Sequence, residues 1–345
     1  DRPYTIYYNS KERMIVLTNY NSILNLIDTE IAIKFIKDYF EKNFSEALHL
    51  TRVSAPLFVL PESGLNDYLN GTERPVKFDV LHLNKEVEIV QSLAKWKRMA
   101  LGKYQFPIDS GLYTDMNAIR RDEILDETHS IYVDQWDWEL IISEKERNLD
   151  FLKSIVKKIY HVILDLSKAI SMKYPKCSID LPNDIFFIST KELENLYPNL
   201  SRKEREKRIT KEKYSVFIYQ IGWDLSDGLP HDGRAADYDD WNLNGDMLLW
   251  NEVLDAPLEI SSMGIRVDKD SLVKQLEKRD ELDKMNNDYV RQVLNHALPL
   301  TIGGGIGQSR LCMYFLKKKH IGEVQASIWS EEEINHLKKK NIHLL

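Results

Sequence analysis

A glycine-rich stretch over 301–310, Thr-Ile-Gly-Gly-Gly-Ile-Gly-Gln-Ser-Arg, limits the folds that this chain can adopt. Gly303, Gly305 and Gly307 fall on one face of an extended strand, because alternate residues of a strand share a face, and that face carries no side chains. The spacing excludes a Walker A loop and a Rossmann fingerprint. A flat ligand can lie against such a face, and Arg310, one turn into the following helix, can stack on a purine. The alternative is a strand whose glycines only allow close helix packing, with Arg310 at the surface.

The composition is that of a soluble globular protein, since the 345 residues are 43% hydrophobic and 29% charged. The net charge of −7 disfavours a general nucleic-acid binder but allows a small anionic ligand held by a few arginines. The only cysteines, Cys177 and Cys312, form no CxxC pattern, which argues against a disulfide framework and fits a reducing compartment. No apolar run approaches a membrane span and no leader opens the chain at Asp1, so we expect a cytoplasmic protein with neither a membrane nor nucleic acid as partner.

The spacing of apolar residues predicts an α+β fold. Helical spacing covers 22–45 and 145–172, and further helices are expected after Gly307 and near Ser330, an N-cap followed by glutamates. The basic run 201–213 contains interspersed glutamates, which favour a solvated helix over a phosphate track. Strands come in runs between helices, which favours a mostly antiparallel central sheet flanked by helices. The predicted strands are 76–80, 129–139, 185–189, 215–221, 246–251, 257–267 and 299–305.

The predicted strand 129–139 has one polar face. Gln135, Asp137 and Glu139 point together, because odd positions share a face. The aromatic residues of the stretch point the other way, namely Tyr132, Trp136 and Trp138. A strand with this aromatic face is expected to be central and buried, so that its amide and carboxylates suit a cavity that binds an ammonium group. The alternative is an edge strand with a solvated polar face.

Clusters of charge lie elsewhere along the chain. Lys95 and Lys97 flank a tryptophan, and Arg120 opens an Arg-Arg-Asp-Glu run, so that these cations can hold carboxylates or phosphates. Alone, such clusters are more often surface lysines and arginines. Asp246 and Glu259 lie in predicted strands and suit Mg²⁺, which takes one or two carboxylates and leaves its other positions to water and phosphate.

Together these stretches resemble the ammonia-dependent asparagine synthetases, the aspartate–ammonia ligases built on a class II aminoacyl-tRNA synthetase core. The resemblance begins near residue 25 and runs to the end of the chain in order. It implies an N-terminal extension of unknown role over 1–20 and a single catalytic domain over 21–345. The matching runs are SLAKWKR (92–98), GLYT (111–114), HSIYVDQWDWE (129–139), LSDG (225–228), DYDDW (237–241), LNGD (243–246), SSMGIRVD (261–268) and TIGGGIGQSRL (301–311).

The three class II motifs have counterparts in this resemblance. Pro56 resembles the proline of motif 1, on the dimer-forming strand, which implies a homodimer. Arg120 resembles the α-phosphate-binding arginine of motif 2, and 303–310 resembles motif 3, whose arginine packs on adenine. Two features depart from the family. The acids Asp122 and Glu123 leave open which one partners Arg120, and the segment after Trp241 is shorter than usual, which leaves open how the site is covered.

The resemblance implies a ligase that makes asparagine from aspartate, ammonia and ATP through a β-aspartyl-adenylate and releases AMP and pyrophosphate. It places ATP on Arg120, Ser130, Asp246, Glu259, Gly305, Gly307 and Arg310, with Mg²⁺ on Asp246 and Glu259. It places aspartate on Ser92, Lys97, Gln135, Asp137, Arg234, Asp239, Ser262 and Arg266. Lys97 and Arg234 would meet carboxylates, and Asp137 and Asp239 the α-ammonium. The catalytic residues would be Arg120, Arg310 and Asp67.

Asp67 is the candidate that takes a proton from ammonium, and its alternative is a turn-forming aspartate between two glycines. Two other functions compete with the ligase. An aspartyl- or asparaginyl-tRNA synthetase core would normally carry an anticodon-binding barrel, for which no segment is left. A non-enzymatic module of the same fold would have lost site residues, yet Arg120, Asp246, Glu259 and Arg310 are all present.

Overall fold

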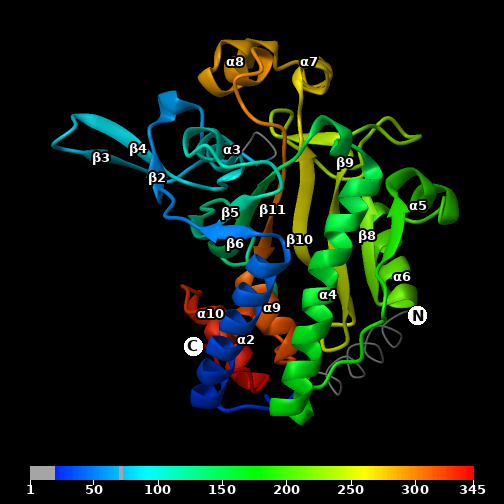
Figure 1. The fold of residues 1–345 in the computed structure, drawn as a ribbon. Coiled ribbons are helices and arrows are strands. Elements are labelled where there is room, and N and C mark those ends of the chain that lie inside the picture. Colours follow the sequence, from blue (N-terminus) through cyan, green and yellow to red (C-terminus); the bar gives the residue numbers. More distant parts are fainter. Residues whose placement is uncertain (1–19, 70–72) are drawn as a thin grey trace, which may run out of the picture.

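The computed structural model describes residues 20–69 and 73–345, so that the expected extension 1–20 lies, apart from Tyr20, outside the described residues. A large sheet forms the centre (Figure 1). Its edge pairs β1–β5 and β7–β8 are parallel and its other neighbours are antiparallel, as predicted. In spatial order its strands are β1 (Leu50–Arg52), β5 (Gly111–Ile119), β6 (Tyr132–Ile141), β11 (Thr301–Gly307), β10 (Ala256–Arg266), β9 (Asp239–Asn251), β8 (Ser215–Tyr219) and β7 (Phe186–Ser189).

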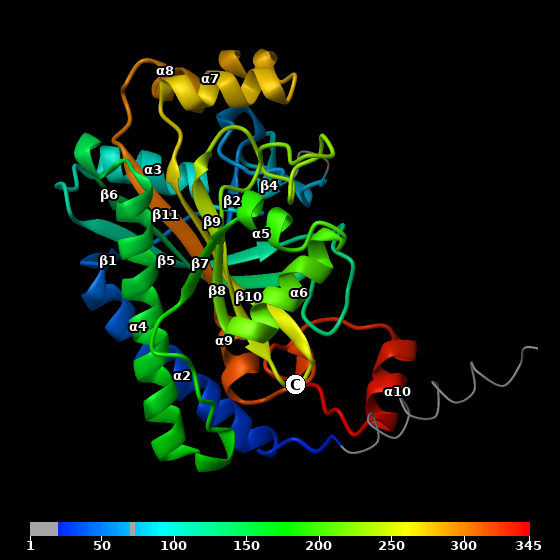
Figure 2. The same cartoon turned by 90° about the vertical axis from the view of Figure 1, so that its right-hand side faces the viewer.

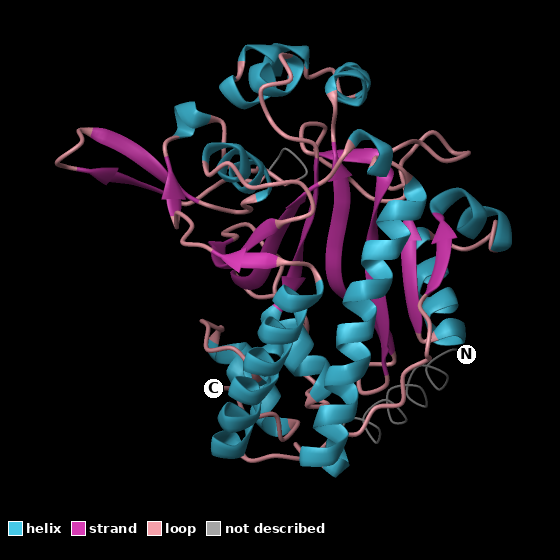
Figure 3. Cartoon of the chain, in the orientation of Figure 1, coloured by secondary structure: helices cyan, strands magenta, loops and turns pink. Residues whose placement is uncertain are grey.

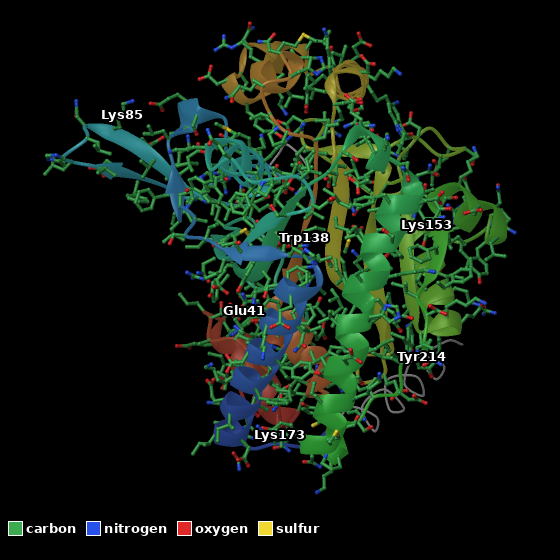
Figure 4. All side chains as sticks on the ribbon, viewed as in Figure 1. Glu41, Lys85, Trp138, Lys153, Lys173 and Tyr214 are labelled. Atoms are coloured by element: carbon green, nitrogen blue, oxygen red, sulfur yellow. The ribbon has the colours of Figure 1, made fainter. Side chains whose placement is uncertain are left out.

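The core lies on one face of this sheet, under α2 (Leu26–Ala47), α4 (Leu149–Lys173) and α9 (Gln308–Phe315). Helix α4 begins where Asn148 accepts a hydrogen bond from Phe151 N, and its apolar residues recur at helical spacing. Trp138 of β6 lies where the sheet meets α2 (Figure 4), edge-on to Phe44 with ring centroids 6.1 Å apart. The predicted aromatic face of this strand is therefore confirmed for its tryptophans.

The opposite face is covered at its two ends and carries the polar residues between them. Helix α3 (Ala94–Lys103) contacts β5, β6 and β11, and α6 (Arg202–Lys213) contacts β8, β9 and β10. Figure 2 shows α4 and α6 on opposite sides of the sheet. The remaining α-helices of the described part are α5 (Thr190–Leu196), α7 (Lys269–Lys278), α8 (Asp288–Leu294) and α10 (Glu331–Lys339). Short 3-10 helices cover Pro61–Ser63, Glu144–Glu146, Pro175–Cys177, Leu282–Asn286 and Ile321–Glu323.

A small second sheet, in the order β2 (Phe58–Val59), β4 (Lys85–Ile89) and β3 (Lys77–Val80), forms a hairpin that projects from the body (Figure 3). The sequence predicts a half-buried strand over 76–80, which is wrong in its burial. Phe78 is 39% exposed and packs edge-on against the exposed ring of Phe58. Phe78 thus packs on another strand of the small sheet, β2, instead of the main core.

The basic run 201–213 forms α6, a solvated helix as predicted, with the i,i+4 ion pair Arg208–Glu212. Two of its arginines have a further function. Arg202 donates through Nε to Pro230 O at 2.6 Å, and Arg205 donates to Tyr197 O at 3.0 Å, so that α6 fixes the loops around it. In the ranges that the structure describes, every helix is too short or too polar to cross a bilayer.

Candidate active site

Hydrogen-bonded pairing between strands brings four predicted residues into one row. Asp246 of β9 lies opposite Ser262 of β10, Ser262 opposite Gly305 of β11, and Gly305 opposite Asp137 of β6. Directly opposite residues on antiparallel strands share a face, so the row points to the polar side of the sheet. Gln135 lies two residues before Asp137 and shares that face. Residues far apart in the sequence thus meet because the sheet aligns them.

A β-bulge adds Glu259 to the same face. Glu259 lies opposite Leu248 and Ser262 opposite Asp246, so three steps along β10 match two steps along β9. The extra residue of a bulge shifts the alternation of faces by one position. Without it, Glu259 and Ser262 would point to opposite sides of the sheet.

A cavity of about 520 Å³ opens on this face. Half of the predicted site lines it, namely Arg120, Ser130, Gln135, Arg234, Glu259, Ser262, Gly307 and Arg310. The other predicted residues are not among those that line it, namely Asp67, Ser92, Lys97, Asp137, Asp239, Asp246, Arg266 and Gly305. Most of this second group is buried directly behind the first.

Lys97 is fully buried and surrounded by oxygen atoms. Its ammonium is paired with the Asp137 carboxylate and donates to Trp138 O at 2.9 Å and Gly304 O at 3.1 Å. Asp137 Oδ2 has no hydrogen-bond partner in the described residues. Two residues predicted to bind opposite charges of one substrate therefore bind each other in this structure, and one carboxylate oxygen remains available.

Arg266 holds two further buried carboxylates. It donates through Nε and Nη2 to Glu139 at 2.8 and 2.7 Å and is also paired with Asp239. Burial by itself would raise the pKa of Glu139, but the Arg266 guanidinium outweighs burial and leaves that pKa below its ordinary value. At Asp239 burial prevails over Arg266, and the pKa is raised.

The glycines of β11 make room for these polar side chains. A Cβ at Gly303 would lie 2.0 Å from Glu139 Oε2, and one at Gly305 would lie 2.2 Å from Gln135 Oε1. The strand face that the sequence predicts as bare is therefore covered at these two positions by side chains of a neighbouring strand. At Gly307 a Cβ would first meet Arg310 Cβ, at 3.2 Å. The glycines therefore do more than allow close helix packing, and they do not leave the strand face fully bare.

Arg120, directly after the end of β5, and Arg310 of α9 line the same cavity. Arg310 donates through Nη1 to Glu259 O at 3.1 Å. Arg120 Nη1 lies 4.0 Å from Glu123 Oε2, and Arg120 Nε is buried with no partner in the parts of the chain that the structure describes. Asp122 is instead held by Arg74, whose Nη2 lies 2.6 Å from its Oδ1. Of the two acids that the sequence leaves open, Glu123 is the one beside Arg120.

Arg234 is paired with Asp246 and also approaches Asp232, at 3.1 Å. Asp246 Oδ1 is buried and has no partner among residues 20–69 and 73–345. Burial raises the pKa of Asp246 to about 6, against the effect of Arg234 and with a further contribution from the nearby Glu259. The same residue ranges contain no group of three or more His, Cys, Asp or Glu side chains that could enclose a metal.

Asp67 is buried beside the cavity. Its Oδ1 accepts a hydrogen bond from Leu69 N at 3.0 Å, which is the bond expected of a turn-forming aspartate. Its Oδ2 is buried and unpartnered in the described chain. Burial raises the pKa of Asp67 to about 6, and the nearby Lys95 opposes this rise. Ser92 accepts from Ala94 N at 3.2 Å at the start of α3.

Two residues of this region have no counterpart among the sequence predictions. Asp134 accepts from Ser309 N at 3.1 Å and Oγ at 2.8 Å, and so joins β6 to the start of α9. It occupies an even position of its strand, which the alternation of faces assigns to the core side. Gln91 is fully buried yet lines the cavity. It lies one residue before a recognised run, and no spacing rule distinguishes it.

Residues 27–341 match the family profile described as Aspartate-ammonia ligase. A protein of Clostridium tetani (strain Massachusetts / E88) named Aspartate--ammonia ligase is 56% identical over 335 residues, which are 97% of this chain and 98% of that protein. One of Ruminiclostridium cellulolyticum (strain ATCC 35319 / DSM 5812 / JCM 6584 / H10) with the same name is 57% identical over 327 residues, covering 94% of this chain and 97% of that protein.

Solved structures with the same fold include the asparaginyl-tRNA synthetase of Pyrococcus horikoshii complexed with asparaginyl-adenylate, with a TM-score of 0.64 and 16% identity over 88% of this chain and 70% of that chain. The Entamoeba histolytica asparaginyl-tRNA synthetase complex with asparaginyl-adenylate has a TM-score of 0.62 and 16% identity over 94% and 71%. This likeness confirms the predicted class II synthetase-like fold.

Proposed function

Because the chain belongs to the aspartate–ammonia ligase family, and is therefore an enzyme that makes asparagine from aspartate, ammonia and ATP, we propose that it does so in the cavity lined by Arg120, Gln135 and Arg310. One observation carries this proposal: two arginines from distant segments line the same cavity as polar side chains of β6 and β10. In the proposed reaction the β-carboxylate of aspartate attacks the α-phosphate of ATP and pyrophosphate leaves. Ammonia then displaces AMP from the β-aspartyl-adenylate.

Arg120 and Arg310 would bind the nucleotide, with Ser130, Gly305 and Gly307 beside it. The unpartnered Nε of Arg120 supports a forked contact with the α-phosphate, where it would neutralise charge as the new bond forms. The bond from Arg310 to Glu259 O lies in the plane of the guanidinium. The face of that plane is then available to stack on adenine.

Asp246 and Glu259 would hold Mg²⁺. The buried, unpartnered Asp246 Oδ1 and the carboxylate of Glu259, which is 44% exposed, form a donor set that fits this ion, because Mg²⁺ takes few protein carboxylates. When bound, the ion would supply positive charge against phosphate oxygens. Arg234 now neutralises Asp246, so it would be released when the ion takes its place.

Aspartate would bind to the buried charge pairs behind the cavity. The substrate carries two carboxylates and one ammonium, and the pairs Lys97–Asp137 and Arg234–Asp246 contain both signs of charge. The free Asp137 Oδ2 supports an ammonium contact, and Arg234, already in the cavity wall, supports a carboxylate contact. The remaining proposed contacts come from Ser92, Gln135, Asp239, Ser262 and Arg266.

The experiment is an assay for AMP and pyrophosphate. We expect both products only when aspartate, ATP, Mg²⁺ and an ammonium salt are all present, and hydroxylamine should trap activated aspartate as the hydroxamate. The change Arg310→Ala should abolish adenylation with an unaltered circular dichroism spectrum, because the arginine lies at the cavity and packs no core. Aspartate-dependent charging of tRNA, or turnover that survives this change, would contradict the proposal.

The homodimer and the cytoplasmic location stay proposals, as does a single domain over 21–345. Leu57 and Phe58, which follow Pro56 and the edge strand β1 in sequence, are 50% and 45% exposed, which supports a second copy covering this segment. Light scattering of the purified chain should give twice the monomer mass. A Phe58→Glu variant should shift it to the monomer.

A further inference from the structure

Two buried acceptor oxygens lie unused beside the cavity. Asp67 and Gln91 are 2% and 0% exposed, and neither Asp67 Oδ2 nor Gln91 Oε1 has a hydrogen-bond partner in the described residues. Buried polar atoms are almost always bonded, so two orphans of the same kind in one place indicate a missing donor. Gln91 lines the cavity, and Asp67 is joined to it by the hydrogen bond from Gln91 Nε2 to Asp67 O, at 3.2 Å.

The orientation of the Gln91 amide is fixed by its neighbours. Its Nε2 donates to Asp67 O and to Glu73 O, at 3.2 and 3.5 Å, and both of these atoms are carbonyl oxygens that only accept. A flipped amide would place Oε1 against two acceptors, so Oε1 must point the other way. Asn66 holds both residues in place, because its Oδ1 accepts from Asp67 N at 3.0 Å and from Gln91 N at 2.9 Å.

We propose that Gln91 and Asp67 together form the ammonium-binding subsite of the enzyme, with Gln91 Oε1 as the second ligand of the ion beside the Asp67 carboxylate. The inference rests on the proposed function, which requires an ammonium ion next to the adenylate. Ammonium fits because it only donates hydrogen bonds and the subsite only accepts them. One carboxylate and one amide oxygen also match a single positive charge.

The surrounding charges agree with this assignment. Lys95 of α3 is the cation that most affects Asp67, and its Nζ is bound to Asp237 Oδ2 at 2.8 Å, so that its charge is largely balanced. Asp237 itself raises the pKa of Asp67, Arg120 lowers it, and Tyr238 is a further titratable group that interacts with this carboxylate. Burial raises the pKa of Asp67 to about 6, which leaves it ionised at neutral pH and able to take a proton.

The second step of the reaction then balances. Ammonium transfers one proton to Asp67 Oδ2 and becomes ammonia. The nitrogen lone pair attacks the β-carbonyl carbon of the adenylate, the C–N bond forms, and the C–O bond to phosphate breaks with its electron pair leaving on AMP. The nitrogen loses its second proton to solvent water, and Asp67 returns its own proton to solvent before the next cycle.

The test compares ammonium with hydroxylamine as nucleophile, because hydroxylamine is neutral at the assay pH and needs no cation site. In Gln91→Leu, kcat/KM for ammonium should fall about tenfold to a hundredfold, the loss expected for one hydrogen bond to a charged group. Hydroxamate formation and aspartate-dependent exchange of pyrophosphate into ATP should each stay within about threefold of the unaltered protein, less than the loss of one such bond.

The matched control is Gln325→Leu, since Gln325 is also a buried, cavity-lining glutamine with an unpartnered Oε1. In the control the ratio of ammonium to hydroxylamine activity should not change.

Gln91→Glu provides a second test that does not depend on the folding of the leucine variant. A second carboxylate beside Asp67 raises the pKa of the pair, so the acid limb of kcat/KM for ammonium should move to higher pH while the exchange reaction keeps its profile. An unchanged nucleophile ratio in Gln91→Leu, or an unmoved acid limb in Gln91→Glu, overturns the subsite while leaving the proposed function intact. Absence of aspartate-dependent exchange in the unaltered protein overturns the proposed function itself, and the subsite with it.

Discussion

Replacing Arg266 by leucine should lower the free energy of unfolding, by an amount that depends on pH. The change removes the two bonds to Glu139 and the ion pair with Asp239, and Glu139 is 0% exposed. Removing one partner of a buried ion pair leaves an uncompensated charge and costs about 3–5 kcal/mol. Lys97 lies 3.7 Å from Glu139 Oε2 and Thr301 Oγ1 donates to Glu139 Oε1 at 2.7 Å, so these two contacts keep the loss within that range at pH 8.

The sign of the pH dependence follows from the pKa shifts. In the unaltered protein Arg266 lowers the pKa of Glu139, so this carboxylate stabilises the fold above its ordinary pKa and loses that effect as the pH falls through the lowered value. Without Arg266, burial alone would raise the pKa of both Glu139 and Asp239. The folded variant would then take up protons that the unfolded chain does not, and its deficit should shrink between pH 8 and pH 5.

Urea unfolding followed by tryptophan fluorescence at pH 8, 6.5 and 5 measures this difference. The control is Arg208→Leu, in which the ion pair with Glu212 is solvent-exposed on both sides and whose loss should be undetectable at every pH. The reasoning would be refuted if Arg266→Leu lost less than about 1 kcal/mol at pH 8, below any measured cost of an unpaired buried charge. It would equally fail if the loss were the same at all three pH values.

Three further changes test the proposed contacts. Arg310→Lys keeps the charge but loses the flat guanidinium, so the KM for ATP in the pyrophosphate exchange assay should rise about tenfold or more; an unchanged KM would rule out stacking on adenine. Asp246→Asn should raise the Mg²⁺ concentration for half-maximal exchange by more than about tenfold, and an unaltered Mg²⁺ titration would remove Asp246 from the metal site. Gly305→Ala places a Cβ 2.2 Å from Gln135 Oε1. It should therefore displace Gln135 and raise the KM for aspartate about fivefold, the loss of one neutral hydrogen bond, and an unaffected KM would exclude Gln135 from the aspartate contacts.

The sequence predicts the fold well where one pattern dominates a segment. Helix α4 and strands β6 and β11 fall within a few residues of their predicted ends, because long apolar periodicity and alternate glycines or tryptophans leave little choice. Strand β9 was expected only from 246, yet it begins at Asp239. Its first half opens with two aspartates and is too polar to be predicted as a strand, and the partner that balances Asp240 is distant in sequence, namely Arg147, whose Nη2 lies 2.6 Å from Asp240 Oδ2.

The sequence predicts which residues belong to the candidate site but not which of them bind one another. Eight of its predicted residues line one cavity, as a resemblance based on motifs can indicate. That Lys97 is bound to Asp137, however, depends on how α3 packs against β6, which no local spacing encodes. Gln91 illustrates the other limit. Its significance comes from the carbonyl oxygens of Asp67 and Glu73, which fix its amide only once the chain has folded.

The bulge in β10 means that the pairing of this segment, more than the identity of the bulged residue, decides on which face the Glu259 carboxylate lies. Ile260 has no polar atom in its side chain, but it is the unmatched residue between Glu259 and Ser261. Its removal would leave Glu259 and Ser262 two positions apart, so that strict alternation would keep the Glu259 carboxylate on the polar face without the bulge. A related sequence that lacks this one residue can therefore hold the same carboxylate in the site with a regular strand, whereas a related sequence of unchanged length needs the bulge.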